Sequence, residues 1–303
     1  MKHALWILLL GACSTDSNPY VAGFSPPDAP QGFVRMIAPP VLAVAPGSDV
    51  TYCQWLADPS DVSRQIATVQ GFQSQGGHHM VLYATTVHET VGTSRLCTQQ
   101  DMLSITFVGA VGGEGGGAGV KLPDGLAFDV PPGMALMANT HYINATDQTF
   151  DAQSVVDVKF GDPKHPLPSV GFLAVNWAGF SIPHGVANFT SDAWCTAPRT
   201  LSFFMWTNHM HEFGVSTFSE VARQDNSVVT MSRDTTWTPD QAFNAPWVRW
   251  DPASPMVVNQ GDRFHVSCTW TNTTNADITA PREMCISSGF TLEAMPQAIC
   301  MAQ

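Results

Sequence analysis

Short runs that alternate apolar and polar residues, or are rich in β-branched and aromatic side chains, recur along the chain between clusters of turn residues. They predict β-strands, and the clearest runs cover residues 80–86 (MVLYATT), 154–160 (SVVDVKF), 201–206 (LSFFMW), 264–271 (FHVSCTWT) and 289–292. Runs of this kind, bounded by Gly, Pro, Asn and Asp, are typical of antiparallel β-sandwiches. No window combines the apolar period and the end signals of an amphipathic helix. The pattern therefore predicts an all-β protein.

Turn residues also indicate where the chain divides. With 303 residues, it is long enough for two ordinary domains or one large all-β domain. The stretch 161–168 (GDPKHPLP) places three prolines directly after a predicted strand, so we expect one domain over 32–162 and a second over 163–303. A glycine-rich stretch at 109–119 lacks the Lys-Ser/Thr pair of a phosphate loop, and we interpret it as a flexible loop.

The first residues have the features of an export signal. Lys2 precedes an apolar run over residues 4–10, which is too short for a membrane-spanning helix of about 20 residues. The Leu-Gly-Ala-Cys tetrad ending at Cys13 resembles the bacterial lipobox, which implies removal of a signal peptide (1–12) and lipidation of the Cys13 thiol. Residues 13–31 are polar and rich in proline, as expected of a flexible tether. We expect an exported bacterial lipoprotein in the periplasm or at the outer membrane or cell surface, held to the membrane only by its N-terminal lipid. An ordinary signal peptide with a chance cysteine is the alternative.

Composition agrees with export and excludes one class of partner. Charged residues make up only 13% of the chain, where about 25% is usual. The net charge is −12, and the 13 Lys and Arg form no run. Because nucleic-acid binding needs clustered basic residues, we expect no nucleic-acid partner.

The cysteine count also fits an exported protein. Seven Cys less the lipidated one leaves 7 − 1 = 6, namely Cys53, Cys97, Cys195, Cys268, Cys285 and Cys300. An even number in this compartment indicates three disulfides, although spacing alone leaves about 15 pairings open. No pair has the CxxC spacing of a thiolate metal site.

Histidines give the clearest chemical signal, since five of the ten lie in three short contexts. His78 and His79 follow two glycines. Adjacent strand residues point to opposite faces, so these two could share an ion only at a strand end or at a bulge, which the glycines permit. His141 ends an apolar stretch. His209 and His211 stand two residues apart, so both imidazoles face the same side of a strand. Imidazole ligands suit copper or zinc, and an added methionine sulfur favours copper.

These contexts, followed by Glu283-Met284-Cys285, resemble in order the motifs of the copper type II, ascorbate-dependent monooxygenases. That family includes peptidylglycine α-hydroxylating monooxygenase and dopamine β-monooxygenase. The resemblance runs from about Cys53 to Cys300 and includes the positions of the six cysteines. It implies one pairing of them: Cys53–Cys97, Cys195–Cys300 and Cys268–Cys285.

The resemblance further implies two tandem antiparallel β-sandwich domains of jelly-roll type, with a copper site on each. The first copper, which passes on an electron, would be held by His78, His79 and His141. The second, the catalytic one that binds O2 and attacks a C–H bond of a small organic substrate, would be held by His209, His211 and Met284. Ascorbate or a similar one-electron donor would be the co-substrate.

Some positions depart from the family. Thr207 stands where the peptide-amidating members have a substrate-binding Arg, and Ile286 and Ser288 replace their Asn and Tyr. A peptide ending in glycine is therefore not the expected substrate, and the substrate contacts are left unassigned.

Two other functions remain open at this point. One is a non-catalytic copper-binding lipoprotein for copper storage, sensing or electron transfer. The other is a zinc hydrolase that uses a single three-histidine site. A complete set of ligands at two places favours the enzyme. The remaining histidines in other contexts have no partner at ligand spacing, and we expect them to be structural: His88, His165, His184 and His265.

Overall fold

The computed structural model describes residues 18–98, 100–116, 120–242, 246–280, 282–295 and 298–302. The expected signal peptide (1–12) and Cys13 lie outside these residues. Within them the fold is all-β, as the hydrophobic pattern predicts, with two short 3-10 helices, η1 (Asp101–Leu103) and η2 (Pro239–Ala242). In this described part, no helix has the length and apolar character needed to cross a bilayer.

All five of the clearest predicted runs fall on strands. The strands are β5 (Gly77–Thr85), β11 (Ser154–Phe160), β15 (Leu201–His209), β20 (Arg263–Trp270) and β22 (Cys285–Thr291). The bounds of β11 agree with the prediction, whereas β15 runs three residues further and ends at His209.

The strands before residue 161 pair only with one another, in three antiparallel sheets. Their orders are β1-β11-β4-β8, β6-β3-β9-β5-β7 and β10-β2. The further strands are β1 (Val34–Ile37), β2 (Val41–Val44), β3 (Asp49–Ala57), β4 (Arg64–Gln73), β6 (Ser94–Leu96), β7 (Ile105–Gly112), β8 (Phe128–Val130), β9 (Ala135–Ile143) and β10 (Phe150–Ala152).

The strands after residue 170 form three more sheets. Their orders are β18-β15-β22-β12-β23, with β19 also on β15, then β14-β20-β16-β17, and β13-β21. All pairs are antiparallel except β12 with β23. The further strands are β12 (Gly171–Trp177), β13 (Ser181–Ile182), β14 (Phe189–Thr196), β16 (Gly214–Ala222), β17 (Val228–Asp234), β18 (Val248–Arg249), β19 (Met256–Val258), β21 (Ile278–Thr279) and β23 (Ala298–Met301).

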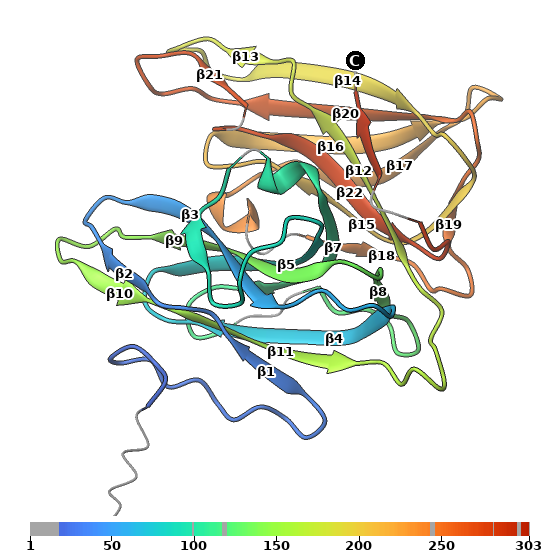
Figure 1. The fold of residues 1–303 in the computed structure, drawn as a ribbon. Helices are drawn as coiled ribbons and strands as arrows, with labels where there is room; N and C mark the ends of the chain where they lie inside the picture. Colours follow the sequence, from blue (N-terminus) through green and yellow to red (C-terminus); the bar gives the residue numbers. More distant parts are fainter. Residues whose placement is uncertain are drawn as a thin grey trace, which may run out of the picture.

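The larger sheets are stacked as layers, consistent with β-sandwiches (Figure 1). The sheets with β4 and β11 and with β14 and β20 are outermost, while those with β5 and β9 and with β15 and β22 lie between them. One hydrophobic core lies within the second half of the chain. A second joins first-half residues such as Leu82 to Phe204, Met205 and Phe290 of the second half. Two smaller clusters lie within the first half.

An aromatic cluster lies where the two inner sheets meet. The ring of Phe290 is 5.4 Å from that of Phe107 and 5.3 Å from that of Phe172, measured between centroids. Phe290 is fully buried. Removing one such ring from water stabilises a structure by about 1.5–3 kcal/mol. The cluster therefore fixes the inner sheets against each other at one end of their contact.

The N-terminal segment makes specific contacts from Pro19 onward, although we expected a flexible tether to residue 31. The Gln153 amide donates to the Pro19 carbonyl at 3.2 Å and accepts from the Val21 N–H at 2.9 Å. Arg35 forms a bidentate ion pair with the buried Asp157 and also donates to the Pro27 carbonyl. These bonds hold the segment against the first half.

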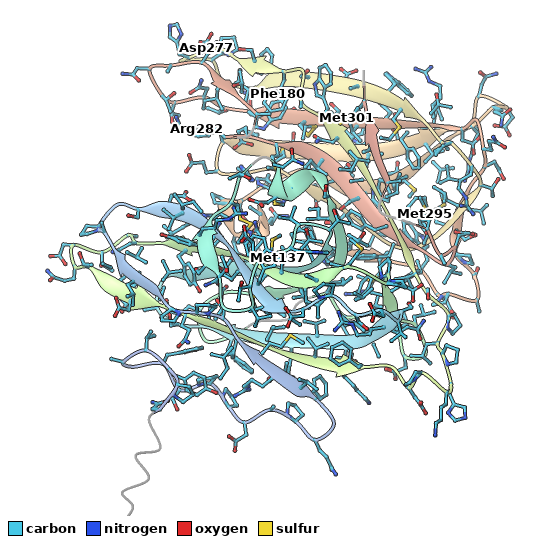
Figure 2. All side chains as sticks on the ribbon, viewed as in Figure 1. Met137, Phe180, Asp277, Arg282, Met295 and Met301 are labelled. Carbon is cyan, nitrogen blue, oxygen red and sulfur yellow. A yellow bond between two sulfur atoms is a disulfide. The ribbon has the colours of Figure 1, made fainter. Side chains whose placement is uncertain are left out.

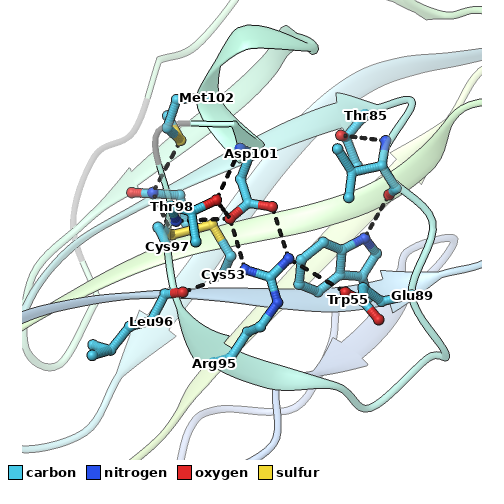
Figure 3. A network of polar contacts seen from close by, with 12 residues as sticks. Cys53, Trp55, Thr85, Glu89, Arg95, Leu96, Cys97, Thr98, Asp101 and Met102 are labelled. Atoms are coloured by element: carbon cyan, nitrogen blue, oxygen red, sulfur yellow. Dashed lines mark hydrogen bonds and ion pairs between the residues drawn. A yellow bond between two sulfur atoms is a disulfide. The ribbon is translucent and has the colours of Figure 1, made fainter.

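Three disulfides confirm the pairing that the resemblance implied: Cys53–Cys97, Cys195–Cys300 and Cys268–Cys285. Beside the first lies a polar network (Figure 3) in which the Asp101 carboxylate accepts from Arg95 at 2.7 and 2.8 Å. Asp101 also accepts the Thr98 N–H, and these bonds lower the pKa of the Asp101 carboxyl, with Arg95 the largest cause.

The same turn recurs in both halves, built on two buried asparagines. The Asn144 amide donates to the Val44 and Gln148 carbonyls at 2.8 Å, and its oxygen accepts the N–H and hydroxyl of Thr146. Asn272 makes the equivalent bonds to Ile182, Ala276 and Thr274. The side-chain nitrogen of each asparagine already donates two hydrogen bonds within the protein. These two Asn-x-Thr sequences therefore have a structural role.

Candidate metal centres

The first histidine cluster depends on a β-bulge at the start of β5. Gly77 pairs with Tyr142 and His79 with His141, so His78 is an extra residue on β5. The bulge turns the His78 side chain to the same face of the sheet as the His79 side chain, as the preceding glycines allowed. Gly76 has φ +73°, and a Cβ there would lie 2.8 Å from the Ile143 carbonyl oxygen. Only glycine fits this approach.

The three imidazoles of this cluster converge. One nitrogen from each of His78, His79 and His141 lies within 4.8 Å of the others. The Nδ1 atoms of His78 and His141 are 3.0 Å apart. Three nitrogens about 2.0 Å from one metal ion would be about 3.3–3.5 Å apart. The set therefore fits one metal ion after shifts of about 1 Å.

Asp49 orients the His141 ring. Its carboxylate oxygen lies 2.5 Å from His141 Nε2, so Nε2 donates the hydrogen bond and Nδ1 keeps the lone pair that faces His78. The carboxylate is 70% exposed, whereas the His141 side chain is 15% exposed. Such a carboxylate fixes the tautomer and raises the basicity of a ligating imidazole.

Burial keeps His78 and His79 neutral. It lowers the pKa of His78 to about 4, with the nearby His141 as the next cause. The pKa of His79 falls well below its ordinary value, again mainly through burial. His209 and His211 add to that lowering.

The glycine-rich stretch flanks this cluster instead of forming a free loop throughout. Residues up to Gly112 belong to β7, whose Gly112 pairs with His79. The Gly113 N–H donates to the His78 carbonyl at 3.1 Å, and the Gly115 N–H donates to that of Gln73 at 3.0 Å. Our interpretation of this whole stretch as a flexible loop was wrong for these residues, because they complete the sheet beside the bulge.

The second pair of histidines lies where β15 ends. The rings of His209 and His211 are 5.1 Å apart between centroids and nearly perpendicular. Met210 between them is fully buried in the core of the second half, so it points away from them as the spacing predicts. Burial is the main cause that lowers the pKa of His209 to about 3, followed by the charge of His211.

The backbone of Met284 lies close to that of His211, just beyond the ends of β15 and β22. His209 pairs with Ile286, the second residue of β22, and the paired residues end there. The N–H groups of His211 and Met284 both donate to Glu283 Oε2, at 3.0 and 3.2 Å. Two imidazoles and a thioether are a donor set suited to copper.

A buried carboxylate holds this second cluster together. Glu283 is fully buried and accepts the backbone N–H groups of His211 at 3.0 Å, Phe213 at 2.7 Å and Met284 at 3.2 Å. It also accepts the Trp270 indole N–H at 2.9 Å. His211 Nδ1 donates to the Arg282 carbonyl at 3.0 Å, which leaves Nε2 for a ligand.

Asp49 and Glu283 were not identified as functional from the sequence. Asp49 is 92 residues from His141, and only the pairing of β3 with β9 brings them together. Glu283 adjoins Met284 in the sequence, but nothing in a Glu-Met-Cys triplet shows that its carboxylate gathers four N–H groups.

The other histidines have structural partners. His88 bonds the Gly133 carbonyl, His165 bonds Asp162, His184 bonds Asp277, and His265 lies between Glu220 and Asp192. Among the described residues, none of these four joins a group of three His, Cys, Asp or Glu at ligand spacing.

No protein-family model and no curated protein matches the sequence. Among solved structures, the chain is similar to PNGase F, a glycosylasparaginase from Flavobacterium meningosepticum, with a TM-score of 0.37 and 10% identity over 89% of this chain and 98% of that one. It is also similar to the major capsid protein P2 of bacteriophage PM2, with a TM-score of 0.35 and 8% identity over 86% and 97% of the two chains. Similarities this low carry no argument about function.

Proposed function

We propose that this protein is a copper-dependent monooxygenase that hydroxylates a C–H bond of a small organic molecule, with O2 and an ascorbate-like reductant. The observation that supports it most is the pair of donor sets on the two inner sheets. One contains three imidazoles, and the other contains two imidazoles and a thioether. The two halves of the chain would be tandem domains, each with one copper site.

The residues at each site favour this chemistry. Copper would supply one-electron exchange and O2 binding. The thioether of Met284 favours the cuprous state, which reacts with O2, whereas the all-imidazole set of His78, His79 and His141 suits electron delivery. Balanced for one turnover, R–H, O2, two electrons and two protons give R–OH and H2O. Two molecules of a one-electron donor provide the electrons.

The chain's own groups prepare both sites. Low pKa values keep His78, His79 and His209 neutral at neutral pH, so their lone pairs are available without loss of a proton. Asp49 and the Arg282 carbonyl fix the rings of His141 and His211.

Export as a lipoprotein is part of the proposal. Three disulfides are typical of an oxidising compartment outside the cytoplasm. Lipidation of Cys13 would hold the enzyme at a membrane surface, where small substrates and reductants of that compartment reach it. Mass spectrometry of the membrane-extracted protein should show a diacyl or triacyl group on Cys13, and an unmodified N-terminus would contradict the anchor.

The test of the enzyme uses the soluble protein without its signal and Cys13, loaded with copper. With ascorbate and a panel of small C–H substrates, we expect substrate-dependent O2 uptake and a hydroxylated product. His209→Ala and Met284→Ala should abolish product formation, whereas His165→Ala, on an exposed histidine outside both clusters, should not.

Two results would contradict the enzyme. Two bound coppers without product from any substrate would favour a copper-storage or electron-transfer lipoprotein. Full activity in both His209→Ala and Met284→Ala would place the chemistry elsewhere.

A further inference from the structure

A cavity of about 270 Å³ lies between the two halves of the chain, beside the aromatic cluster of the inner sheets. Both halves contribute to its wall, and the residues that matter below are Thr106, Phe107, Phe128, Asp129, Phe172 and Met295. Sites for drug-sized ligands usually measure about 300–1,000 Å³. The cavity therefore suits a smaller molecule.

This cavity is separate from both histidine clusters. Phe107 lies 112 − 107 = 5 residues along β7 from Gly112, which pairs with His79, so about 17 Å of strand separates the cavity from the first cluster. Figure 2 shows Met295 on the opposite side of the second half from Arg282, whose carbonyl oxygen accepts from the second cluster. A ligand in the cavity would thus contact neither set of metal ligands.

The Asp129 carboxylate on the wall has no cationic partner. It is partly buried, and no described residue forms an ion pair with it. Its Oδ1 accepts from Gln65 Nε2 at 3.0 Å, but that nitrogen also donates to the Leu167 carbonyl and the Ser169 hydroxyl. Its Oδ2 makes no hydrogen bond within the described part of the chain. Because a charge that is removed from water without a partner costs free energy, a bound cation would stabilise this carboxylate.

The rest of the wall is mainly aromatic and aliphatic. The rings of Phe107 and Phe172 are stacked, with centroids 5.3 Å apart, and Phe128 meets Phe107 edge to face at 5.5 Å. Met295 packs over Gly171, where a Cβ would lie 2.3 Å from the Met295 Cγ. None of the residues that line the cavity is Lys, Arg or His. The wall therefore favours an apolar body that carries a positive charge, since aromatic rings also attract cations.

We propose that this cavity binds a small primary amine in its charged form, with the ammonium group on Asp129 Oδ2 and the apolar body against the phenylalanine rings and Met295. An ammonium group donates hydrogen bonds, and such bonds are stronger when donor and acceptor are both charged. The Thr106 hydroxyl makes no hydrogen bond with the described residues, so it is available as a second acceptor. A carboxylate ligand would meet the charge of Asp129 and find no cation on the wall.

This inference does not rest on the proposed function, because binding needs neither copper nor turnover. It has a consequence for the fold. Since Asp129 belongs to the first half and Met295 to the second, a bound amine contacts both halves and stabilises their packing. A ligand that binds only the folded state raises the resistance to unfolding as its concentration rises.

Three molecules with one apolar body test the class of ligand: 3,3-dimethylbutylamine, 3,3-dimethylbutan-1-ol and 3,3-dimethylbutanoate. Calorimetry uses the soluble protein without its signal and Cys13, in EDTA so that the amine has no copper to bind. We expect the amine to bind at least about tenfold more tightly than the alcohol, and the butanoate to bind most weakly. Equal affinities, a preference for the butanoate, or no binding of the amine would overturn the proposal.

Asp129→Asn tests the charged contact, because asparagine keeps the shape of the side chain and an oxygen for Gln65. We expect it to weaken binding of the amine by at least about tenfold while the alcohol binds as before. Asp124→Asn is the control, since Asp124 is exposed and does not line the cavity, yet the change in net charge is the same. An equal loss in the control, or unchanged binding of the amine in Asp129→Asn, would refute the role of Asp129.

A second pair of variants tests the place without altering Asp129. Ala294 is exposed and lines the cavity, so Ala294→Lys brings a cation to the wall and should fold. It should weaken binding of the amine several-fold and strengthen binding of the butanoate. Val228→Lys, on an exposed residue of β17 in the outer sheet, should do neither. The amine should also raise the urea midpoint of the wild type but not that of Asp129→Asn, and the same rise in both would contradict binding in this cavity.

Discussion

Replacing Glu283 by Gln should weaken copper binding at the second cluster without affecting the first. Three donors, the N–H groups of His211, Met284 and the Trp270 indole, face Oε2, while the Phe213 N–H faces Oε1 at 2.7 Å. A glutamine can keep its oxygen toward the three donors, but its NH2 group then opposes the Phe213 N–H. One buried donor loses its acceptor, and the other bonds lose their charge.

The magnitude follows from these contacts. A hydrogen bond to a charged group contributes about 1.5–3 kcal/mol, and an unsatisfied buried donor costs about 1–3 kcal/mol. We expect Glu283→Gln to lower the free energy of unfolding by about 2–4 kcal/mol. Loss of a group that positions ligands weakens metal binding by about 10–100-fold.

Urea unfolding of the metal-free protein and competition titration of Cu(I) against a chelator measure the two effects. Glu293→Gln is the control, since Glu293 accepts one backbone N–H, from Ser202 at the other end of β15. We expect two copper equivalents in each protein, with one weakened only in Glu283→Gln. An unchanged second equivalent, or an equal loss in the control, would refute the role of Glu283.

Three further predictions concern other parts of the molecule. Asp49→Asn should weaken copper at the first cluster by about tenfold in a chelator titration, because His141 loses a charged acceptor, whereas Asp162→Asn, which removes the carboxylate beside His165, should not. Asn144→Ala and Asn272→Ala should each lower the free energy of unfolding by about 2–4 kcal/mol, since each leaves buried groups unpaired, while Asn188→Gly on an exposed turn should change it by less than about 0.5 kcal/mol. The metal-free protein should lose unfolding free energy as pH falls from about 6.5 to 4, because the unfolded chain protonates histidines that the folded state keeps neutral, with pKa values of about 4 for His78 and about 3 for His209. His209→Gln should reduce that pH dependence in urea titrations, and an unchanged slope would contradict the burial of a neutral His209.

Local sequence patterns predicted the strands well, but contacts between distant segments could not be predicted from those patterns. The β-branched run 154–160 identified β11 correctly because its three valines are buried. The prediction for β15 stopped at residue 206 because Thr207, Asn208 and His209 are polar. Asn208 is nevertheless buried, since Asp234, Ser219 and Ser287 satisfy its amide.

The same distinction holds for the candidate metal centres: their local features could be predicted from the sequence, whereas contacts between distant segments could not. Two glycines before two histidines allowed either a strand end or a bulge, because backbone freedom is a local property, and the structure has the bulge. The contacts of Asp49 and Glu283 depend on which strands become neighbours. Strand register is set by the packing of the whole sheet, so a single sequence does not reveal it.

A single turnover tests the central claim most directly. The protein is loaded with two Cu(I), freed of excess reductant, and mixed with substrate and O2. The account predicts one hydroxylated product for every two Cu(II) formed, counted by electron paramagnetic resonance, and one oxygen atom from labelled O2 in that product. Oxidation of both coppers without product, or binding of only one copper per chain, would contradict it.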